Sequence, residues 1–103
     1  MTAPPQFELL DESSDDDARA FTWRLQILAP DGGLTTHALR LAWADYDLWS
    51  GGAGSPAAVA EAALGLLMLR APELAARDRI ELAWVRRVDP AADAEIPQRL
   101  RLI

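Results

Sequence analysis

The chain of 103 residues contains no cysteine, no lysine and no asparagine, and His37 is its single histidine. The absence of cysteine excludes disulfide bonds, thiol nucleophiles and cysteine zinc sites. A single histidine also excludes a metal site built from several histidines. These absences remove several common classes of enzyme and metalloprotein.

The sequence also lacks long hydrophobic runs. No apolar stretch approaches the roughly 20 residues of a membrane-spanning helix, and the N-terminal residues lack the charged-then-apolar pattern of a signal peptide. Half of the residues are hydrophobic and a quarter are charged, which fits one small folded domain. The alanine-rich composition, with arginine in place of lysine, is typical of a GC-rich bacterial genome. We therefore expect a cytoplasmic bacterial protein that does not associate with membranes.

The negative charge lies mainly near the N-terminus. Six of the 16 acidic residues fall within residues 1–20, together with one arginine, whereas residues 21–103 are nearly neutral. The run Ser13–Asp17 has no apolar periodicity, which is typical of disorder. We therefore predict a disordered acidic tail over residues 1–20 and a single domain over residues 21–103. Two other interpretations are that Phe7–Leu10 is a short binding motif, or that the acids cover an arginine patch of the same chain.

The excess of acid argues against a nucleic-acid partner. Binding to a phosphate backbone requires a dense cationic face. In this chain the arginines gather only at Arg86–Arg87 and at Arg99 and Arg101. We therefore do not expect nucleic-acid binding.

Residues 21–43 show the clearest structural pattern. Apolar and polar side chains alternate over residues 21–27 and again over residues 38–43, on both sides of the turn-forming sequence Pro30–Gly33. A period of two around a turn predicts a β-hairpin with one face toward the core. The side chains expected on the core face are Trp23, Leu25, Ile27, Leu39, Leu41 and Trp43. Those expected to face water are Arg24, Gln26 and Arg40.

A long helix is predicted from Pro56 to Arg70. Ser55 is a favourable N-cap, proline is favourable at the first helical position, and Pro72 prevents the helix from continuing. The segment before it, residues 44–54, is expected to be a loop because its glycines do not suit a regular strand.

This helix lacks the polar side expected of a surface helix. Over residues 57–69 the only charged side chain is Glu61, and Leu64 and Met68 lie on the same side of the helix. A helix that is apolar on all sides is normally buried on all sides. We therefore expect either the C-terminal segment or a second copy of the protein to cover Leu64 and Met68.

Residues 79–88 fit two patterns. Alternating apolar residues suit a strand, whereas apolar residues three to four positions apart suit a helix, and this segment contains both. Periodicity therefore leaves strand and helix open, and Asp89–Pro90 ends the element in either case. Residues 91–95 are expected to make one or two helical turns before Pro97.

The loop over residues 44–54 holds several residues suited to binding. Asp45 and Asp47 could serve as acid and base or hold a hard cation, but no further ligands accompany them, and the alternative is a structural role in the turn. Tyr46 and Trp49 are candidates for contact with a partner, because aromatic residues are common at binding hot spots. The alternative for Trp49 is a lid packed over the end of the hairpin.

Two further chemical interpretations involve the same region. Residues 45–55 include a glycine-rich loop that leads into a helix N-terminus, and helix N-termini attract anions. This loop contains no arginine. His37 could act as a base with Ser50 or Ser55 as nucleophile, but no nucleophile-elbow motif surrounds either serine, and His37 also fits the rim of the core. We expect no catalytic, cofactor-binding or metal-binding residue and no cofactor.

Parts of the chain resemble a group of small uncharacterised bacterial proteins, in which a β-hairpin is followed by a Ser-Pro-start helix and a second helix that ends at a proline. The matching stretches are Leu41–Gly52, Ser55–Leu69 and Ile80–Ile96, with a departure at Ile80–Glu81, where that group usually has an aromatic residue and an aspartate. The resemblance covers roughly residues 21–97 and implies that residues 81–88 are helical, but it implies no activity. A more distant resemblance, to antitoxins of the HicB type, rests on a hairpin followed by a helix.

Together these patterns predict an α+β domain of ββαα type, with a β-hairpin packed on a long apolar helix and one or two short C-terminal helices. The expected function is that of a non-enzymatic protein-interaction or adaptor module. Its partner would be a second copy, bound through the outer side of the helix or the open edges of the two-stranded sheet, or another protein. The candidate partner-binding residues are Tyr46, Trp49, Leu64, Met68 and Trp84. The alternatives are a small anion- or ligand-binding module that uses residues 45–55, and an antitoxin-like regulator.

Overall fold

The computed structural model describes residues 6–101. In chain order its elements are β1 (Gln6–Asp15), β2 (Ala20–Leu28), β3 (Leu34–Ala42), α1 (Trp43–Ser50), α2 (Pro56–Arg70), β4 (Arg79–Glu81), the 3-10 turn η1 (Leu82–Trp84), α3 (Val85–Val88) and α4 (Ala92–Arg101). Across this range, no helix combines the length and the hydropathy needed to cross a membrane. The predicted α+β class is confirmed, with two more strands than the hairpin supplies.

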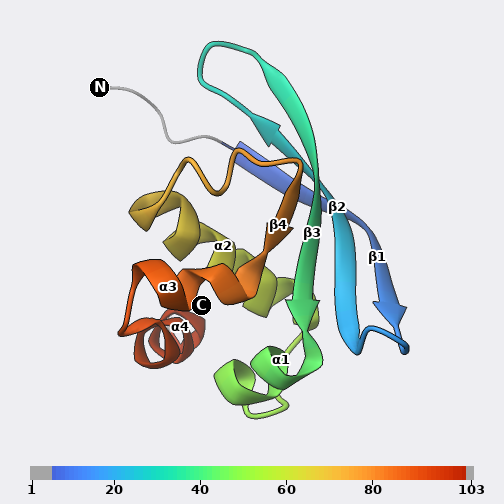
Figure 1. Cartoon of the computed structure of the whole chain (residues 1–103), viewed down its shortest axis with the longest axis vertical. Helices are drawn as coiled ribbons and strands as arrows, with labels where there is room; N and C mark the ends of the chain where they lie inside the picture. The colour runs from blue at the N-terminus through green and yellow to red at the C-terminus, as the bar shows by residue number, and fades with distance from the viewer. Residues whose placement is uncertain (1–5, 102–103) are drawn as a thin grey trace.

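The four strands form one sheet in the order β1-β2-β3-β4. Neighbouring strands among the first three are antiparallel, and the short β4 runs parallel to β3. The helices gather on one side of the sheet (Figure 1). Burial along the second half of β3 alternates between buried and exposed, which agrees with one covered face and one face open to water. The core therefore lies between a sheet layer and a helix layer.

The predicted hairpin is confirmed as the antiparallel pair β2 and β3. The side chains buried on its core face include Trp23, Leu25, Leu39 and Leu41. Ile27 is half-buried, and Trp43 does not extend this face as a strand residue, because β3 ends at Ala42 and Trp43 begins α1. The main chain therefore turns from strand to helix one residue before the end of the alternating pattern.

The prediction of a disordered tail over residues 1–20 is wrong for the part that the structure describes. Residues 6–15 form β1, an edge strand that pairs with β2. Phe7 and Leu9 pack against the core, and two of the acids have partners on β2: Asp11 lies 3.3 Å from Arg24, and Glu12 accepts a hydrogen bond from Trp23. Pairing with β2 and apolar contacts thus outweigh the repulsion among the acids, and the folded domain begins before residue 21.

The prediction of an irregular loop over residues 44–54 is wrong in its first half, which forms α1. The sequence from Trp43 to Ser50 contains no glycine or proline, so nothing interrupts a helix there. Gly51 then adopts the left-handed conformation (φ 66°) that commonly ends a helix, and its N–H donates to the Asp47 carbonyl. The glycines therefore terminate the helix rather than prevent it.

The predicted helix over residues 56–70 is confirmed as α2, and the Ser55 hydroxyl oxygen accepts the Ala58 N–H at 3.1 Å. This helix lies between the sheet and the C-terminal helices and contacts α3 and α4. Leu64 on its outer side is fully buried, and Met68 is half-buried. Leu64 is thus covered within the chain, whereas Met68 lines a hollow that it shares with Phe7 of β1.

The C-terminal third combines the two alternatives that periodicity left open. Residues 79–81 form the short strand β4, and residues 82–88 continue as η1 and α3. The helix ends before Asp89, as predicted, but α4 continues past Pro97, where a stop was expected. Ile96 is fully buried and Leu100 packs against the core, so packing on both sides of Pro97 offsets the loss of one backbone hydrogen bond.

Candidate functional site

Trp49, expected as a partner contact or a lid, is buried in the core with 2% of its surface exposed. Its indole N–H donates to Asp93 at 2.8 Å, and the Arg86 guanidinium lies 5.0 Å from the centre of its ring. Arg86 also pairs with Asp45 at 2.6 Å and with Asp93 at 2.9 Å. These four residues, here called the Arg86 cluster, join α1, α3 and α4. Asp45 therefore has the structural role that was the alternative to acid–base or cation chemistry.

Hydrogen bonds within the Arg86 cluster favour the charged forms of Arg86 and Asp93. The hydrogen bond to Asp45 is the main cause that raises the pKa of Arg86 above its ordinary value. The hydrogen bond from Trp49 is the main cause that lowers the pKa of Asp93, and Arg86 adds to this effect. Arg86 and Asp93 therefore both remain charged at neutral pH, where a general acid or base would need a pKa near 7.

Of the other predicted contact residues, Leu64 lies wholly inside the chain and offers no surface to a partner. Tyr46 is half-buried: its hydroxyl donates to the Gly54 carbonyl at 2.6 Å, and its ring packs edge-on against Phe21. Trp84 is half-buried beneath the Arg77 guanidinium, 5.7 Å from the ring centre. Both aromatic residues thus have contacts within the chain that account for their positions.

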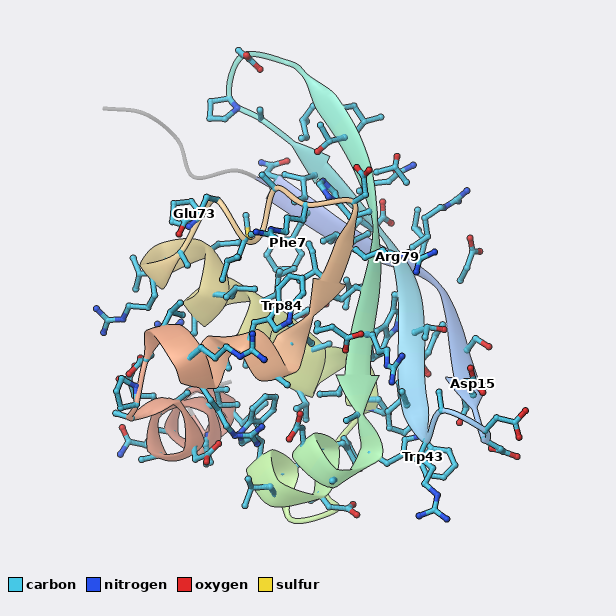
Figure 2. The ribbon with its side chains drawn as sticks, in the orientation of Figure 1. Phe7, Asp15, Trp43, Glu73, Arg79 and Trp84 are labelled. Carbon is cyan, nitrogen blue, oxygen red and sulfur yellow. The ribbon has the colours of Figure 1, made fainter. Side chains whose placement is uncertain are left out.

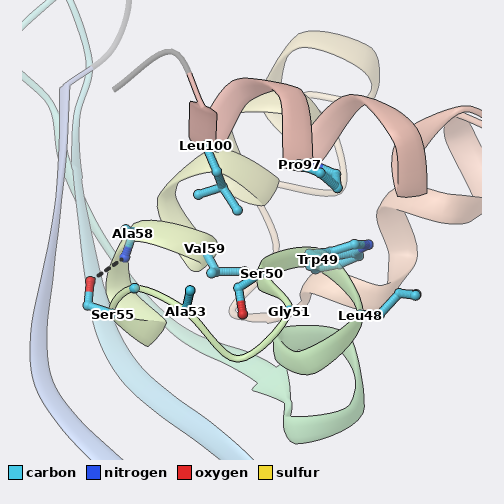
Figure 3. A pocket seen from close by; sticks show the side chains of 11 residues that line it. Leu48, Trp49, Ser50, Gly51, Ala53, Ser55, Ala58, Val59, Pro97 and Leu100 are labelled. Atoms are coloured by element: carbon cyan, nitrogen blue, oxygen red, sulfur yellow. Dashed lines mark hydrogen bonds between the residues drawn. The ribbon is translucent and has the colours of Figure 1, made fainter.

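The glycine-rich loop borders a hollow of about 650 Å³, closed on the far side by Pro97 and Leu100 of α4 (Figure 3). The start of α2 forms part of its wall, as the anion-binding interpretation of residues 45–55 requires. However, no arginine lines the hollow in the described part of the chain. Moreover, the Ser55 hydroxyl oxygen already accepts a hydrogen bond from the Ala58 N–H. The geometry therefore gives the anion interpretation no cation to support it.

His37 is buried at the rim of the core, as the structural interpretation predicted. Because a carbonyl oxygen only accepts, Nδ1 donates to the Arg77 carbonyl, and Nε2 accepts from the Thr35 hydroxyl at 2.8 Å. Ser50 and Ser55 line a different hollow from His37, so the suggested base and nucleophiles are not brought together. Within residues 6–101, no three histidine, aspartate or glutamate side chains form a group that could hold a metal ion.

The feature that sequence reasoning missed is the edge of β1 and the hollow beside it. β1 pairs with β2 on one side and forms the outer edge of the sheet. Phe7, on the helix side of the sheet (Figure 2), lines a second hollow of about 600 Å³ together with Met68 and Leu69 of α2. The alternation of Phe7 and Leu9 with polar neighbours was the available signal, but the acidic run that follows it dominated the prediction.

Comparison with protein-family models, curated proteins and solved structures gives no match for this chain. The resemblance to small bacterial proteins and to HicB-type antitoxins therefore stays a prediction. The candidate site, the β1 edge with its hollow, is defined by the geometry of this chain alone.

Proposed function

We propose that this protein is a non-enzymatic interaction module that binds a basic, extended segment of another protein along the free edge of β1. The observation that carries the proposal is the edge strand β1, whose residues 6–10 pair regularly with β2 beside an apolar hollow, ahead of an irregularity between Leu10 and Ser13. Each edge strand presents backbone N–H and C=O groups that an added strand can pair with. Addition of a peptide strand to a sheet edge is a common mode of recognition, in which neighbouring pockets select the side chains.

The charge of β1 favours a basic partner. Glu8 of β1, and Asp16 and Asp17 of the turn that follows it, are exposed and have no ion pair with another described side chain. An added strand with arginine or lysine would place an opposite charge beside Glu8, which favours cross-strand pairing, and the two turn acids attract the same cations at longer range. A second copy paired through β1 would instead bring two acidic strands together.

The expected homo-oligomer would have to form through one of two surfaces. On the outer side of α2, which was one expected interface, Leu64 is fully buried, and Met68 lines the hollow beside β1. The other expected interface, a sheet edge, is acidic along β1 and only three residues long at β4. A different, basic protein therefore suits the surface of this chain better than a second copy.

The test uses the full chain and a fluorescent ten-residue peptide in which arginine and valine alternate. We expect fluorescence anisotropy to detect saturable binding that weakens with salt. A peptide N-methylated at every second residue keeps one hydrogen-bonding edge and should bind, whereas one methylated at every residue should lose at least tenfold in affinity. Equal affinity of the unmodified and fully methylated peptides would show that only charge is recognised, which contradicts strand addition.

A pair of charge-matched variants locates the binding surface. Replacing one acid of β1 and two of the turn after it (Glu8→Gln, Asp16→Asn, Asp17→Asn) should weaken binding of the peptide about tenfold, since three exposed ion pairs contribute roughly 0.5 kcal/mol each. The control replaces three exposed acids elsewhere (Glu61→Gln, Glu73→Gln, Asp78→Asn) and changes the net charge equally. Equal weakening by both sets would mean that net charge, and not the β1 edge, attracts the peptide.

A further inference from the structure

The hollow beside β1, here called the Phe7 hollow, is apolar on most of its surface. Its volume of about 600 Å³ lies within the range of small-ligand sites. Its walls come from the sheet, with Phe7, Ile27 and His37, from α2, with Met68 and Leu69, and from the segment after α2, with Ala76. In the described part of the chain no acidic or arginine side chain lines it. The occupant that fits this lining is therefore neutral and apolar.

The polar side chains that line the Phe7 hollow are already paired. Both ring nitrogens of His37 have partners, and one of them is the Thr35 hydroxyl, which also lines the hollow. An occupant with a charged head group would find no counter-charge on the lining, and its desolvation would be uncompensated. Leu69, by contrast, is 64% exposed, and Met68 is an adaptable apolar side chain that can adjust to an incoming group.

Building on the proposed function, we infer that the partner segment is anchored by one bulky apolar side chain that enters the Phe7 hollow. Side chains of a strand alternate between its two faces, and residues opposite each other on neighbouring strands lie about 4.5–5.5 Å apart at Cβ. In a strand added to β1, the residue opposite Phe7 would thus point toward α2, on the side where the hollow lies. The preferred partner is a basic strand with a leucine or phenylalanine at that position.

The inference is tested by moving one leucine along an otherwise constant arginine–alanine peptide and measuring the affinity of each version for the full chain. We expect the peptide with leucine at one position to bind at least tenfold tighter than the peptides with leucine at the adjacent positions, where the side chain points to the opposite face of the strand. The reason is that burial of a leucine side chain is strongly favourable. Equal affinities across the series would overturn the inference of an anchoring side chain. Such a result would leave peptide binding, and hence the proposed function, in place. Absence of binding by every peptide would overturn both.

A spectroscopic signal reports on the hollow directly. The chain has two methionines, Met1 and Met68, so methyl-labelled methionine gives a simple NMR spectrum in which Met68 reports on the hollow. The best leucine peptide should shift the Met68 methyl resonance, and its alanine counterpart should not. An unchanged Met68 resonance at saturation with the leucine peptide would contradict the anchor.

A hollow-filling variant completes the test. Ala76 lines the hollow and is exposed, so Ala76→Leu should narrow it without disturbing the core. This variant should bind the leucine peptide no tighter than the alanine peptide, whereas Ala94→Leu, at an exposed alanine of α4, should keep the wild-type preference. If Ala76→Leu keeps the full preference for leucine, the anchor lies elsewhere and the inference is wrong.

Discussion

The Arg86 cluster and the β1 strand both depend on carboxylates, but they leave them in contrasting surroundings. In the cluster, Asp45 and Asp93 lie 2.6 and 2.9 Å from one guanidinium, and Asp45 is buried. Along β1 and the turn after it the acids are exposed, and among the described residues only Asp11 forms an ion pair with an arginine, Arg24. Charges paired inside the molecule hold helices together, whereas charges left at an open edge are available to a partner.

The largest expected effect comes from removing the cation of the cluster. Arg86→Met leaves Asp45 buried without its charge partner, and loss of one member of a buried pair costs about 3 kcal/mol of unfolding free energy. Urea unfolding measures this change. Arg87→Met, at the exposed neighbour, should change stability by less than about 0.5 kcal/mol. Equal effects of the two variants would show that the cluster contributes nothing specific.

A smaller effect is expected from the pH dependence of Asp93, which is about half exposed. Its pKa is lowered in the folded protein, chiefly by the hydrogen bond from Trp49. Its stabilising contribution is therefore complete above the pKa of the unfolded chain, and it is lost as pH falls from there through the folded pKa. Asp93→Asn should thus be destabilised by about 1 kcal/mol at pH 7 and by less at pH 3, as followed by urea unfolding at each pH. A difference between variant and wild type that stays constant with pH would contradict this account.

The smallest effect on stability is expected from the exposed acids of β1 and of the turn after it. Neutralising Glu8, Asp16 and Asp17 together should leave the free energy of unfolding within about 0.5 kcal/mol of wild type or raise it slightly, because like charges are removed. Thermal unfolding of the triple variant beside its charge-matched control measures this. A loss above about 1 kcal/mol would mean that these acids hold the strand in place, and the contrast with the Arg86 cluster would disappear.

The elements with strong local signals were predicted well from the sequence. The hairpin followed from alternation around a turn, and α2 followed from its serine cap, its first proline and the proline after its end. Residues 79–88 carried mixed signals, and the structure uses both in succession. Local sequence patterns therefore predicted an element correctly where only one backbone conformation fits the pattern.

The candidate site could not be predicted in the same way. β1 forms because β2 supplies hydrogen bonds, an arginine for Asp11 and an indole N–H for Glu12. The Phe7 hollow combines residues of β1, β2 and β3 with residues of α2 and the segment after it, which are far apart in the sequence. Neither β1 nor the Phe7 hollow has a local sequence pattern strong enough to override the prediction of disorder that the acidic run gives.

The sequence by itself determined the α+β class, the hairpin and the bounds of the long helix, because capping and periodicity act over a few neighbouring residues. Only the tertiary structure decided that the acidic segment becomes an edge strand, that Trp49 and Leu64 are internal, and that Met68 lines a hollow with Phe7. The physical reason is that burial and charge pairing depend on which distant residues meet, and this is set by the packing of the whole chain.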